Sequence, residues 1–308
     1  MNKKLITAVA AFLLLIPISA NAALKNTEVS LPSIAILDTA IDSKLPQLNG
    51  KVIYEACFTS NSSCPGGKSF VEGTGAAYLP SNIISNNGFD HGTGITSVAI
   101  KSNPNVNIVF IRIIGNTPTG GRAVTPSTTI AMALNWATQN KDKFNIKAIS
   151  MSQGHHNLRS TPDYCPKDSA VEAEINRAIT NNIGVFFPAG NSWDSRLDWP
   201  ACIPNSIAVG ATDPNGYIAG YSNFDSNLID FVTPGYENVL RPSGQTQYAV
   251  GTSLAVQVAA GNWATLASAK PTYTYQQLYD LLAKTSGSAM NSKYKTNRVI
   301  NLQGALNG

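Results

Sequence analysis

Short and nearly continuous apolar segments recur along the chain, and runs of this kind are typical of strands buried on both faces of a sheet. They are Ser33–Leu37, Val106–Ile113, Ile146–Met151, Ile183–Pro188 and Ser206–Ala211. Each run is rich in β-branched residues and too short for a typical helix. The pattern therefore predicts several buried strands spread over most of the chain.

Helical patterns lie between these segments. The stretch from Thr125 to Asn140 has a capping residue, Thr125, followed by Pro126 at the first turn. The stretch from Asp168 to Asn182 repeats the arrangement, with Asp168 as the cap. The apolar positions of the two stretches follow the helical period: Ile130, Leu134 and Ala137 in the first, and Val171, Ile175, Ala178 and Ile179 in the second.

Strands that alternate with helices predict an α/β fold, a three-layer sandwich with a mainly parallel central sheet flanked by helices. Two stretches rich in Gly, Ser, Asn and Pro, Asn49–Asn87 and Gly115–Thr125, are expected to be long loops. Gln276–Leu282 is expected to form a short amphipathic helix, and Arg298–Leu306 to dock on the body of the protein. Ligands of such sheets bind at the carboxyl ends of the strands.

The first 22 residues place Lys3 and Lys4 before an apolar run and end on small residues, which predicts a cleaved secretory signal peptide. A membrane anchor is the alternative, but the run is shorter than the roughly 20 apolar residues that a span requires. No internal repeat or linker is evident, so residues 23–308 are expected to form a single domain, and the protein to be exported to the periplasm or secreted.

Charge and composition narrow the possible partners. Charged residues make up 13% of the chain and apolar residues 43%, which is typical of a compact globular protein and excludes a disordered one. The formal charge of +4 includes the two lysines of the signal peptide, and the other basic residues do not cluster. A chain of this kind lacks the basic surface that nucleic-acid binding requires.

The four cysteines, Cys57, Cys64, Cys165 and Cys202, all follow the signal peptide. In an oxidising compartment an even number favours disulfides, and three pairings are possible. A local Cys57–Cys64 bond would leave Cys165 to pair with Cys202. A zinc site is disfavoured because no cysteine has a Cys or His neighbour at the spacing that zinc sites use, so no metal is expected there.

The stretch "GTSLAVQVAAG", from Gly251 to Gly261, could hold a nucleophilic serine or simply a capped helix of small residues. A nucleophilic hydroxyl needs a base, most often histidine, and the chain has only His91, His155 and His156. His91 lies at the expected start of a helix, and Asp38 ends a predicted strand. Asp38, His91 and Ser253 together could form a catalytic triad in which the carboxylate orients the imidazole.

The order of these residues distinguishes between protease folds. An α/β-hydrolase has the order Ser, Asp, His and the motif G-x-S-x-G, but no histidine follows His156 and Ala255 stands where the second glycine would be. A chymotrypsin-like protein is built from β-barrels, whereas this chain alternates strands and helices. The order Asp, His, Ser is the one found in subtilisin.

Six segments then carry a resemblance to a known family: "AILDTAID", "HGTGITSVA", "ISMSQG", "FFPAGN", "SIAVGATD" and "GTSLAVQVAAG". Their order and spacing resemble the motifs of the subtilisin-like serine proteases, over residues 33–266. The resemblance implies Asp38 as the orienting acid, His91 as the general base and Ser253 as the nucleophile of a serine endopeptidase.

The resemblance also implies further site residues. Asn191 would donate to the oxyanion, and Ser152, Gln153 and Gly154 would pair with the substrate backbone as an added strand. Asp198 would lie near the floor of the pocket for the residue before the scissile bond and favour Lys or Arg, unless it serves only a surface ion pair or a turn. A Cys165–Cys202 disulfide is common in the family, which supports that pairing.

The chain departs from the family at several positions. Gln257 replaces a usual proline, Gly94 a usual histidine, and Ala40 a usual glycine, and we expect altered packing at these positions without loss of activity. Gln47 stands where many relatives have an acidic calcium ligand, so no calcium is expected there. The expected reaction requires no cofactor.

The resemblance leaves two alternative functions open. Few residues separate the signal peptide from the first predicted strand, so no prodomain is recognisable, a layout similar to that of the catalytic subunit of subtilase-type bacterial cytotoxins. The protein could therefore be the proteolytic subunit of a multi-chain toxin, with a partner subunit. It could also be a catalytically idle binding or scaffold protein on the same fold.

Overall fold

The strand β1 (Ser33–Asp38) is an interior strand of a mainly parallel sheet in the computed structural model, which describes residues 31–48, 50–84, 88–156 and 165–308. Every residue of β1 is buried, and the strand pairs in parallel with β4 (Asn107–Arg112) and with β5 (Ile146–Met151). The predicted signal peptide lies outside the described residues. Because the chain order reverses at β1, the carboxyl ends of β1 and β5 form a topological switch point, where ligands of such sheets bind.

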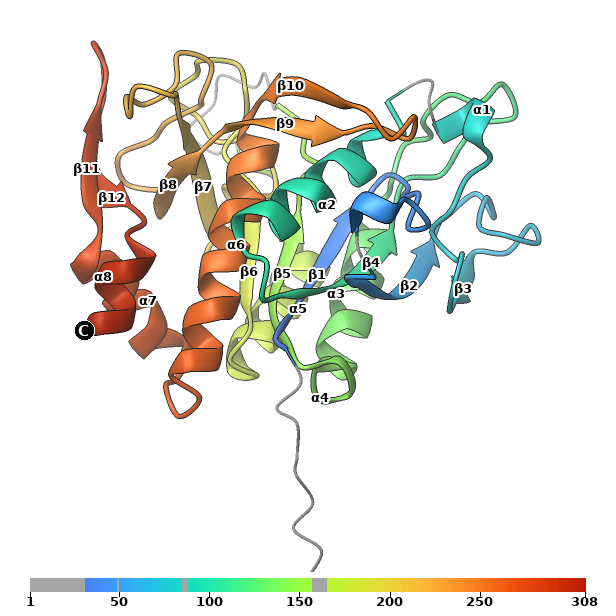
Figure 1. Cartoon of the computed structure of the whole chain (residues 1–308), viewed down its shortest axis with the longest axis horizontal. Helices are drawn as coiled ribbons and strands as arrows, with labels where there is room; N and C mark the ends of the chain where they lie inside the picture. Colours follow the sequence, from blue (N-terminus) through green and yellow to red (C-terminus); the bar gives the residue numbers. More distant parts are fainter. Residues whose placement is uncertain (1–30, 49, 85–87, 157–164) are drawn as a thin grey trace, which may run out of the picture. The chain divides into compact units, whose positions relative to one another are not determined.

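The full sheet has the order β11-β12-β8-β7-β6-β5-β1-β4-β2-β3, and its pairs are parallel except β2 with β3 and β11 with β12 (Figure 1). The other strands of the sheet are β2 (Val52–Phe58), β3 (Phe70–Glu72), β6 (Gly184–Pro188), β7 (Ile207–Thr212), β8 (Phe231–Pro234), β11 (Gly287–Met290) and β12 (Lys295–Val299). A separate antiparallel pair consists of β9 (Tyr236–Leu240) and β10 (Thr246–Val250).

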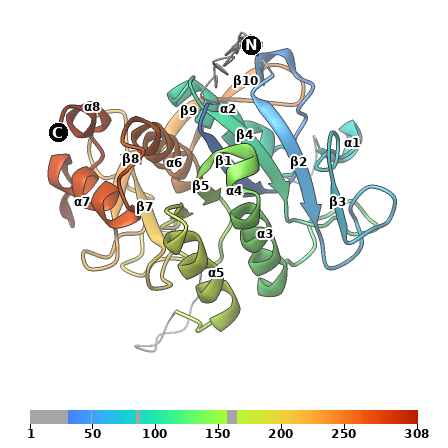
Figure 2. The same cartoon turned by 90° about the horizontal axis from the view of Figure 1, so that it is seen from below.

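The helices cover both faces of the sheet (Figure 2). They are α1 (Ser81–Ile84), α2 (His91–Ser102), α3 (Ser127–Gln139), α4 (Lys141–Phe144), α5 (Ser169–Thr180), α6 (Thr252–Ala269), α7 (Tyr275–Thr285) and α8 (Leu302–Asn307), with a short 3₁₀ turn at Pro46–Leu48. The apolar faces of α3 and α5 lie in one core, and those of α2 and α6 in the other.

Successive side chains of β1 supply the two cores in turn. Ala35 and Leu37 belong to the core under α3 and α5, whereas Ile34 and Ile36 belong to the core under α2 and α6. A strand that buries both sets needs apolar residues at every position, which explains the continuous runs in the sequence. The predicted three-layer α/β fold with a mainly parallel sheet is confirmed.

Several predicted boundaries need correction. Asn49–Asn87 is not simply a loop, since it contains β2, β3 and α1. The partner strand β4 and the adjacent β3 order β2 through hydrogen bonds that the local composition does not reveal. Thr125 does not cap α3, because its hydroxyl donates to the carbonyl of Ile113 (3.0 Å) and the helix begins only after Pro126.

Other local predictions are confirmed. The carboxylate of Asp168 caps α5 by accepting from the N–H groups of Ala170 and Val171. The expected helix at Gln276–Leu282 is α7, which begins with a capping box between Thr274 and Gln277. The terminal segment docks on α6 and α7 through α8, whose Ala305 is buried.

Both expected disulfides are present. Cys57 at the end of β2 bonds Cys64, and Cys165 before α5 bonds Cys202. The second bond joins positions 37 residues apart in the sequence. By restricting the unfolded chain, a loop of that length stabilises the folded state by about 3–4 kcal/mol.

The start of α2 packs closely against the end of β1. A Cβ atom on Gly92 would collide with the carbonyl oxygen of Ala40 and with the ring of Phe110. The hydroxyl of Thr39 accepts from the N–H of Gly92 (3.0 Å) and donates to the carbonyl of Phe89 (2.9 Å). These contacts fix His91, the first residue of α2, beside the carboxyl end of β1.

Gly92→Ala is expected to lower the free energy of unfolding by about 1–3 kcal/mol, because the helix must move away from β1 to accommodate the methyl group. Gly94→Ala in the same helix is the matched control, since its Cβ would make only ordinary contacts, at 3.4 Å from Val239. That control should be neutral or more stable by up to about 1 kcal/mol. Urea unfolding followed by tryptophan fluorescence measures both variants, and equal stabilities would contradict the proposed close contact.

Candidate active site

The residues singled out from the sequence come together at the carboxyl ends of three strands. Asp38 is the last residue of β1, Ser152–Gly154 follow β5, and Asn191 follows β6. His91 and Ser253 are brought to the same edge by the first turns of α2 and α6. A pocket of about 190 Å³ lies there. Its walls include His91, Arg122, Ser152, Gln153, Gly154, Gly190, Asn191, Asp198, Thr252 and Ser253.

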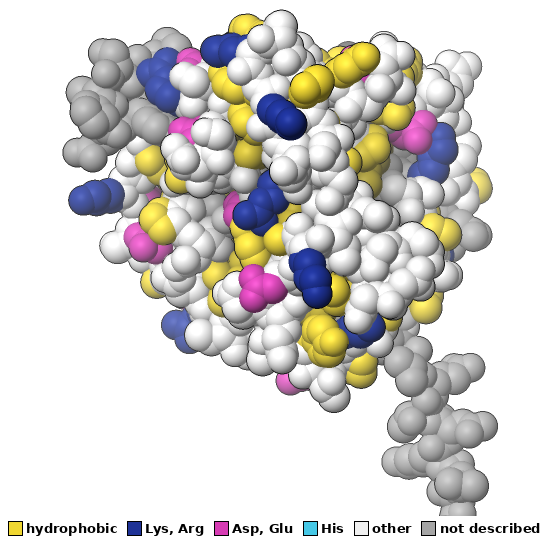
Figure 3. Space-filling view, turned by 90° about the vertical axis from the view of Figure 1, so that its left-hand side faces the viewer, with side chains coloured by type: hydrophobic (Ala, Val, Ile, Leu, Met, Phe, Trp, Pro, Cys, Tyr) yellow, Lys and Arg dark blue, Asp and Glu magenta, His cyan; other side chains and the backbone are white. Residues whose placement is uncertain are grey.

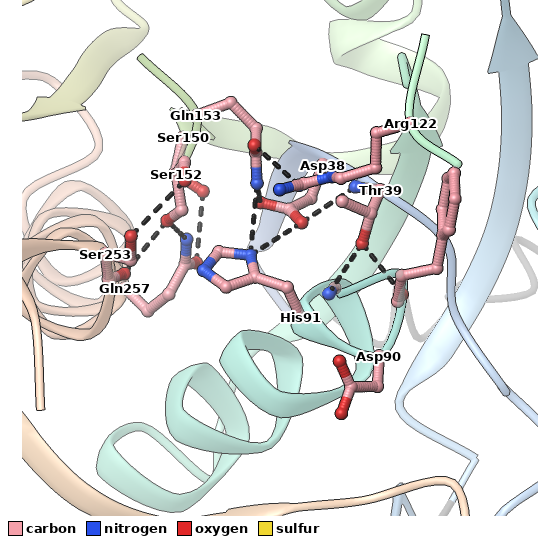
Figure 4. Close-up of polar contacts among 12 residues, drawn as sticks. Asp38, Thr39, Asp90, His91, Arg122, Ser150, Ser152, Gln153, Ser253 and Gln257 are labelled. Carbon is pink, nitrogen blue, oxygen red and sulfur yellow. Dashed lines mark hydrogen bonds and ion pairs between the residues drawn. The ribbon is translucent and has the colours of Figure 1, made fainter. Parts of the chain in front are cut away.

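Asp38 and His91 are in direct contact. The Nδ1 atom of His91 lies 2.8 Å from Oδ1 of Asp38, whose carboxylate is fully buried (Figure 4). This oxygen also accepts from the N–H of Thr39 (2.7 Å), and Oδ2 accepts from Nε2 of Gln153 (2.9 Å). With Nδ1 donating to Asp38, Nε2 of the imidazole is the nitrogen free to accept a proton.

The environment of Asp38 keeps it ionised. Burial by itself would raise the pKa of this carboxyl group. The charge and hydrogen bond of His91, together with the donations from Gln153 and Thr39, outweigh burial and hold the pKa of Asp38 below its ordinary value. A carboxylate held in this way can stabilise a positive charge that develops on His91.

Ser253 is joined to the segment after β5 by two hydrogen bonds. Its Oγ donates to the carbonyl of Ser152 (3.3 Å), and the hydroxyl of Ser152 donates to the carbonyl of Ser253 (2.9 Å). Gln257, one turn further along α6, is fully buried and continues the network: its Nε2 donates to the hydroxyl of Ser152 (2.8 Å), and its Oε1 accepts from Ser150 (3.1 Å). The residue that replaces the usual proline therefore ties the helix of Ser253 to β5.

The Asn191 side chain is oriented by Thr252. Its Oδ1 accepts from both the N–H (2.9 Å) and the hydroxyl (3.1 Å) of Thr252. An amide whose oxygen accepts these two hydrogen bonds directs its nitrogen away from Thr252. Gly190 precedes it at φ +112°, and a Cβ there would collide with Asn223 and Asp198, so only glycine fits this turn.

Asp198 lines the pocket and also contacts His156 and Asn223. Its Oδ1 accepts from Nδ1 of His156 (2.9 Å) and from the amide of Asn223 (3.1 Å). The Nε2 atom of the same histidine lies 3.2 Å from Asp194, so His156 bridges two carboxylates. Burial raises the pKa of Asp198, although His156 opposes this effect. Asp198 thus lines the pocket and also makes polar contacts with His156 and Asn223.

Sequence reasoning missed several contributors. Arg122 lies in a predicted loop and donates from Nη2 to Oε1 of Gln153 (2.8 Å), and Thr39 and His156 were not assigned to the site. The only sequence signal among them is the position of Thr39, which directly follows the end of β1. The φ angle of Ala40 is not positive, so alanine in place of the usual glycine leaves the backbone unstrained there.

Within the described part of the chain, no group of three or more His, Cys, Asp or Glu side chains could hold a metal ion. Over the same residues, no helix has the length and apolar character that crossing a membrane requires.

Comparison with known proteins identifies relatives over most of the chain. The model of the Subtilase family matches residues 30–305. Subtilisin E of Bacillus subtilis (strain 168) is 29% identical over 287 residues, which cover 88% of this chain and 65% of that protein. Subtilisin BL of Lederbergia lenta is 27% identical over 241 residues, which cover 75% of this chain and 82% of that protein. The chain thus spans slightly less than two thirds of the length of Subtilisin E.

Two solved structures have a similar fold. A protease of Pseudoalteromonas arctica has a TM-score of 0.71 at 23% identity, with 90% of each chain covered. The prenylagaramide maturation protease PagA has a TM-score of 0.65 at 20% identity, with 90% of this chain and 93% of that chain covered. At these identities the likeness concerns the fold.

Gln257→Leu is expected to lower the free energy of unfolding by about 1–3 kcal/mol, because it leaves the buried hydroxyl of Ser150 without its acceptor. Thermal and urea unfolding measure the loss. The matched control is the same change in a Ser150→Ala background, where no donor is orphaned and the loss should be smaller. An equal loss in both backgrounds would contradict the contribution given to the hydrogen bond between Ser150 and Gln257.

Proposed function

This chain belongs to the subtilase family, and we propose that it is an exported serine endopeptidase that hydrolyses peptide bonds through an acyl-enzyme on Ser253. The observation that carries the proposal is the 2.8 Å contact between His91 and the buried Asp38, in a pocket that Ser253 also lines. An isolated buried carboxylate destabilises a fold, so the contact with His91 is needed to keep Asp38 charged at this position.

In the proposed mechanism, Oγ of Ser253 attacks the carbonyl carbon of the substrate while Nε2 of His91 takes the hydroxyl proton. His91 then gives that proton to the leaving amine as the C–N bond breaks, and an ester on Ser253 remains. Water repeats the sequence in the second half: its oxygen attacks the ester, His91 takes its proton, and the proton returns to Oγ as the acid product leaves. Asp38 stabilises the imidazolium in both halves.

The attack requires a change at the nucleophile. The hydroxyl of Ser253 donates to the carbonyl of Ser152 at 3.3 Å, a long hydrogen bond that a rotation of the side chain breaks. We propose that this rotation redirects the hydroxyl to Nε2 of His91 when substrate binds. In Figure 4 the imidazole lies between Asp38 and Ser253, which supports this path.

Asn191 and the N–H of Ser253 are the proposed donors to the oxyanion. Thr252 orients the amide of Asn191 before substrate arrives, and preorganised donors of this kind require no rearrangement during the reaction. Loss of one such donor typically lowers turnover about 10² to 10³-fold.

We propose that the substrate is a protein or peptide whose backbone pairs with Ser152–Gly154, as an extended strand added to the edge of the site. Asp198 lines the pocket beside this segment, and its carboxylate favours Lys or Arg before the scissile bond. His156 competes for that carboxylate, so we expect a preference and not an absolute requirement.

Export and the absence of cofactors are part of the proposal. Two disulfides are typical of proteins from oxidising compartments, periplasmic or extracellular. The proposed reaction uses only side chains, and we propose that no calcium binds at Gln47, whose Nε2 donates to the carbonyl of Gly244 (2.9 Å).

Nucleic acid is not a proposed partner: on the face shown in Figure 3, Lys and Arg side chains are dispersed and form no continuous patch.

The two alternatives differ from this proposal in what they predict. A catalytically idle scaffold would not react with an active-site probe, although it would share the fold. A toxin subunit would react like the isolated protease but would co-purify with a partner chain from its native host.

The full chain is expected to react covalently with a fluorophosphonate probe at Ser253. Ser253→Ala should abolish labelling because the attacking oxygen is gone, and His91→Ala should slow it at least about 10³-fold because the base is lost. Gel fluorescence and mass spectrometry of the labelled peptide measure the reaction.

His155→Ala is the matched control for the loss of a histidine. His155 is exposed, and its ring packs against Trp199, away from Asp38. It should label at the rate of the wild type. Folded wild-type protein without Ser253-dependent labelling would rule out the serine endopeptidase.

Peptide substrates with Lys or Arg before the scissile bond are expected to have a kcat/KM at least about tenfold above that of matched neutral peptides at neutral pH. Because the pKa of Asp198 is raised, its charge is lost at a higher pH than that of an ordinary aspartate as the solution is acidified. The ratio of the two kcat/KM values should therefore fall toward acid pH, and a ratio cancels effects on the catalytic residues.

Asp198→Asn keeps the shape of the side chain and should remove both the preference and its pH dependence. A preference that persists in this variant would assign the selectivity to another residue.

A further inference from the structure

The side chain of Gln153 lies between a surface arginine and the catalytic pair. Its Nε2 atom is 2.9 Å from Oδ2 of Asp38 and 3.1 Å from Nδ1 of His91. Its Oε1 accepts from Nη2 of Arg122 at 2.8 Å (Figure 4). The side chain is thus turned inward to the catalytic pair, in addition to any role of its backbone in binding substrate.

Arg122 determines which end of the amide faces Asp38. An amide can present either oxygen or nitrogen, but a guanidinium has only donors. The guanidinium therefore binds the amide oxygen, and the amide nitrogen must face the carboxylate. The reversed amide would place an oxygen against Asp38 and a nitrogen against Arg122, and both contacts would be repulsive.

Gln153 donates a hydrogen bond to the oxygen of Asp38 that Thr39 and His91 do not contact. Thr39 and His91 both donate to Oδ1 of Asp38, whereas Gln153 donates to Oδ2. Arg112 lies opposite Asp38 in the register of β1 and β4, but its guanidinium donates to the carbonyl groups of Ile114 and Ser63 and to Asn116. A fully buried carboxylate oxygen without a donor is strongly destabilised in its charged form.

The amide nitrogen of Gln153 also lies close to Nδ1 of His91, at 3.1 Å. In the reactive tautomer Nδ1 carries its proton and donates to Asp38, so the Gln153 nitrogen cannot also donate to it. Its protons are directed to Oδ2, and the amide packs beside the Nδ1 side of the ring. In this position it restricts rotation of the imidazole away from Asp38.

We propose that Arg122 and Gln153 act as a clamp that positions Asp38, and through it His91, for proton transfer from Ser253. Both are positioning residues: Gln153 acts through Asp38, and Arg122 acts through the orientation of the Gln153 amide. This inference rests on the proposed serine endopeptidase function.

The test compares the full chain with Gln153→Leu, Arg122→Ala and the double variant, using a small neutral ester substrate and a small fluorophosphonate. Gln153→Leu should lower kcat about tenfold and leave KM unchanged, since it removes a hydrogen bond to a charged group and no contact with a small substrate. Arg122→Ala should lower kcat about threefold by releasing the amide. The double variant should be no slower than Gln153→Leu alone, because Arg122 has nothing left to orient.

The pH profile separates this role from a purely structural one. Donation from Gln153 is one of the interactions that lower the pKa of Asp38. Without it that pKa rises, so on the acid side the rate of Gln153→Leu should decline at a higher pH than the rate of the wild type. Arg122→Lys keeps a donor for Oε1 of Gln153 and should restore most of the rate lost in Arg122→Ala.

Gln276→Leu is the matched control. Gln276 is an exposed residue of α7 whose Nε2 donates to the carboxylate of Asp280 at 2.9 Å, and its loss should alter neither kcat nor the pH profile. Circular dichroism verifies that each variant is folded. Arg122 is exposed, so its variants test the clamp even where Gln153→Leu does not fold.

A folded Gln153→Leu with the kcat and pH profile of the wild type would overturn the clamp, and so would a change confined to KM. Additive losses in the double variant would overturn the role given to Arg122. Failure of the underlying function is distinguishable, because the wild type itself would then show no Ser253-dependent labelling.

Discussion

The buried carboxylate of Asp38 is the constraint on which the rest of the site depends. It lies at the carboxyl end of the interior strand β1, with no exposure to solvent. A charge in such a place is tolerated only if the protein replaces the lost hydration. Thr39, His91 and Gln153 do so from three separate segments, and therefore the packing of β1, α2 and the segment after β5 is coupled to one ionised group.

A second network holds Ser253 in relation to that group. Gln257 is a buried polar residue in a helix whose other inward positions are almost all apolar. Its amide uses both ends, toward Ser150 and Ser152, and Ser152 in turn exchanges hydrogen bonds with Ser253. Fully satisfied networks of this kind define one arrangement of the elements that they join. The segment Ser150–Gln153 thus links the helix of Ser253 to the Asp38 and His91 pair.

Much of this architecture follows from local sequence. The strands of the parallel sheet are recognisable as continuous apolar runs because both of their faces are buried. The cap at Asp168 is recognisable because a carboxylate accepts hydrogen bonds from the first N–H groups of a helix. The strand β2 does not, since its first three residues are half-buried or exposed and it depends on β3 and β4 for its hydrogen bonds. Thr125 failed as a cap because a tertiary partner, the carbonyl of Ile113, binds its hydroxyl instead.

The sequence by itself determined the fold class, because buried strands and amphipathic helices are local patterns of the chain. Strand ends, residue order and the family resemblance predicted Asp38, His91, Asn191 and Ser253 as site residues. Tertiary structure alone decided what surrounds them. The inward turn of Gln153, its partner Arg122, the bridge of Gln257 and the sharing of Asp198 with His156 each join segments that are far apart in the sequence. Hydrogen bonds depend on distance and angle in space, and no spacing along the chain encodes those directly.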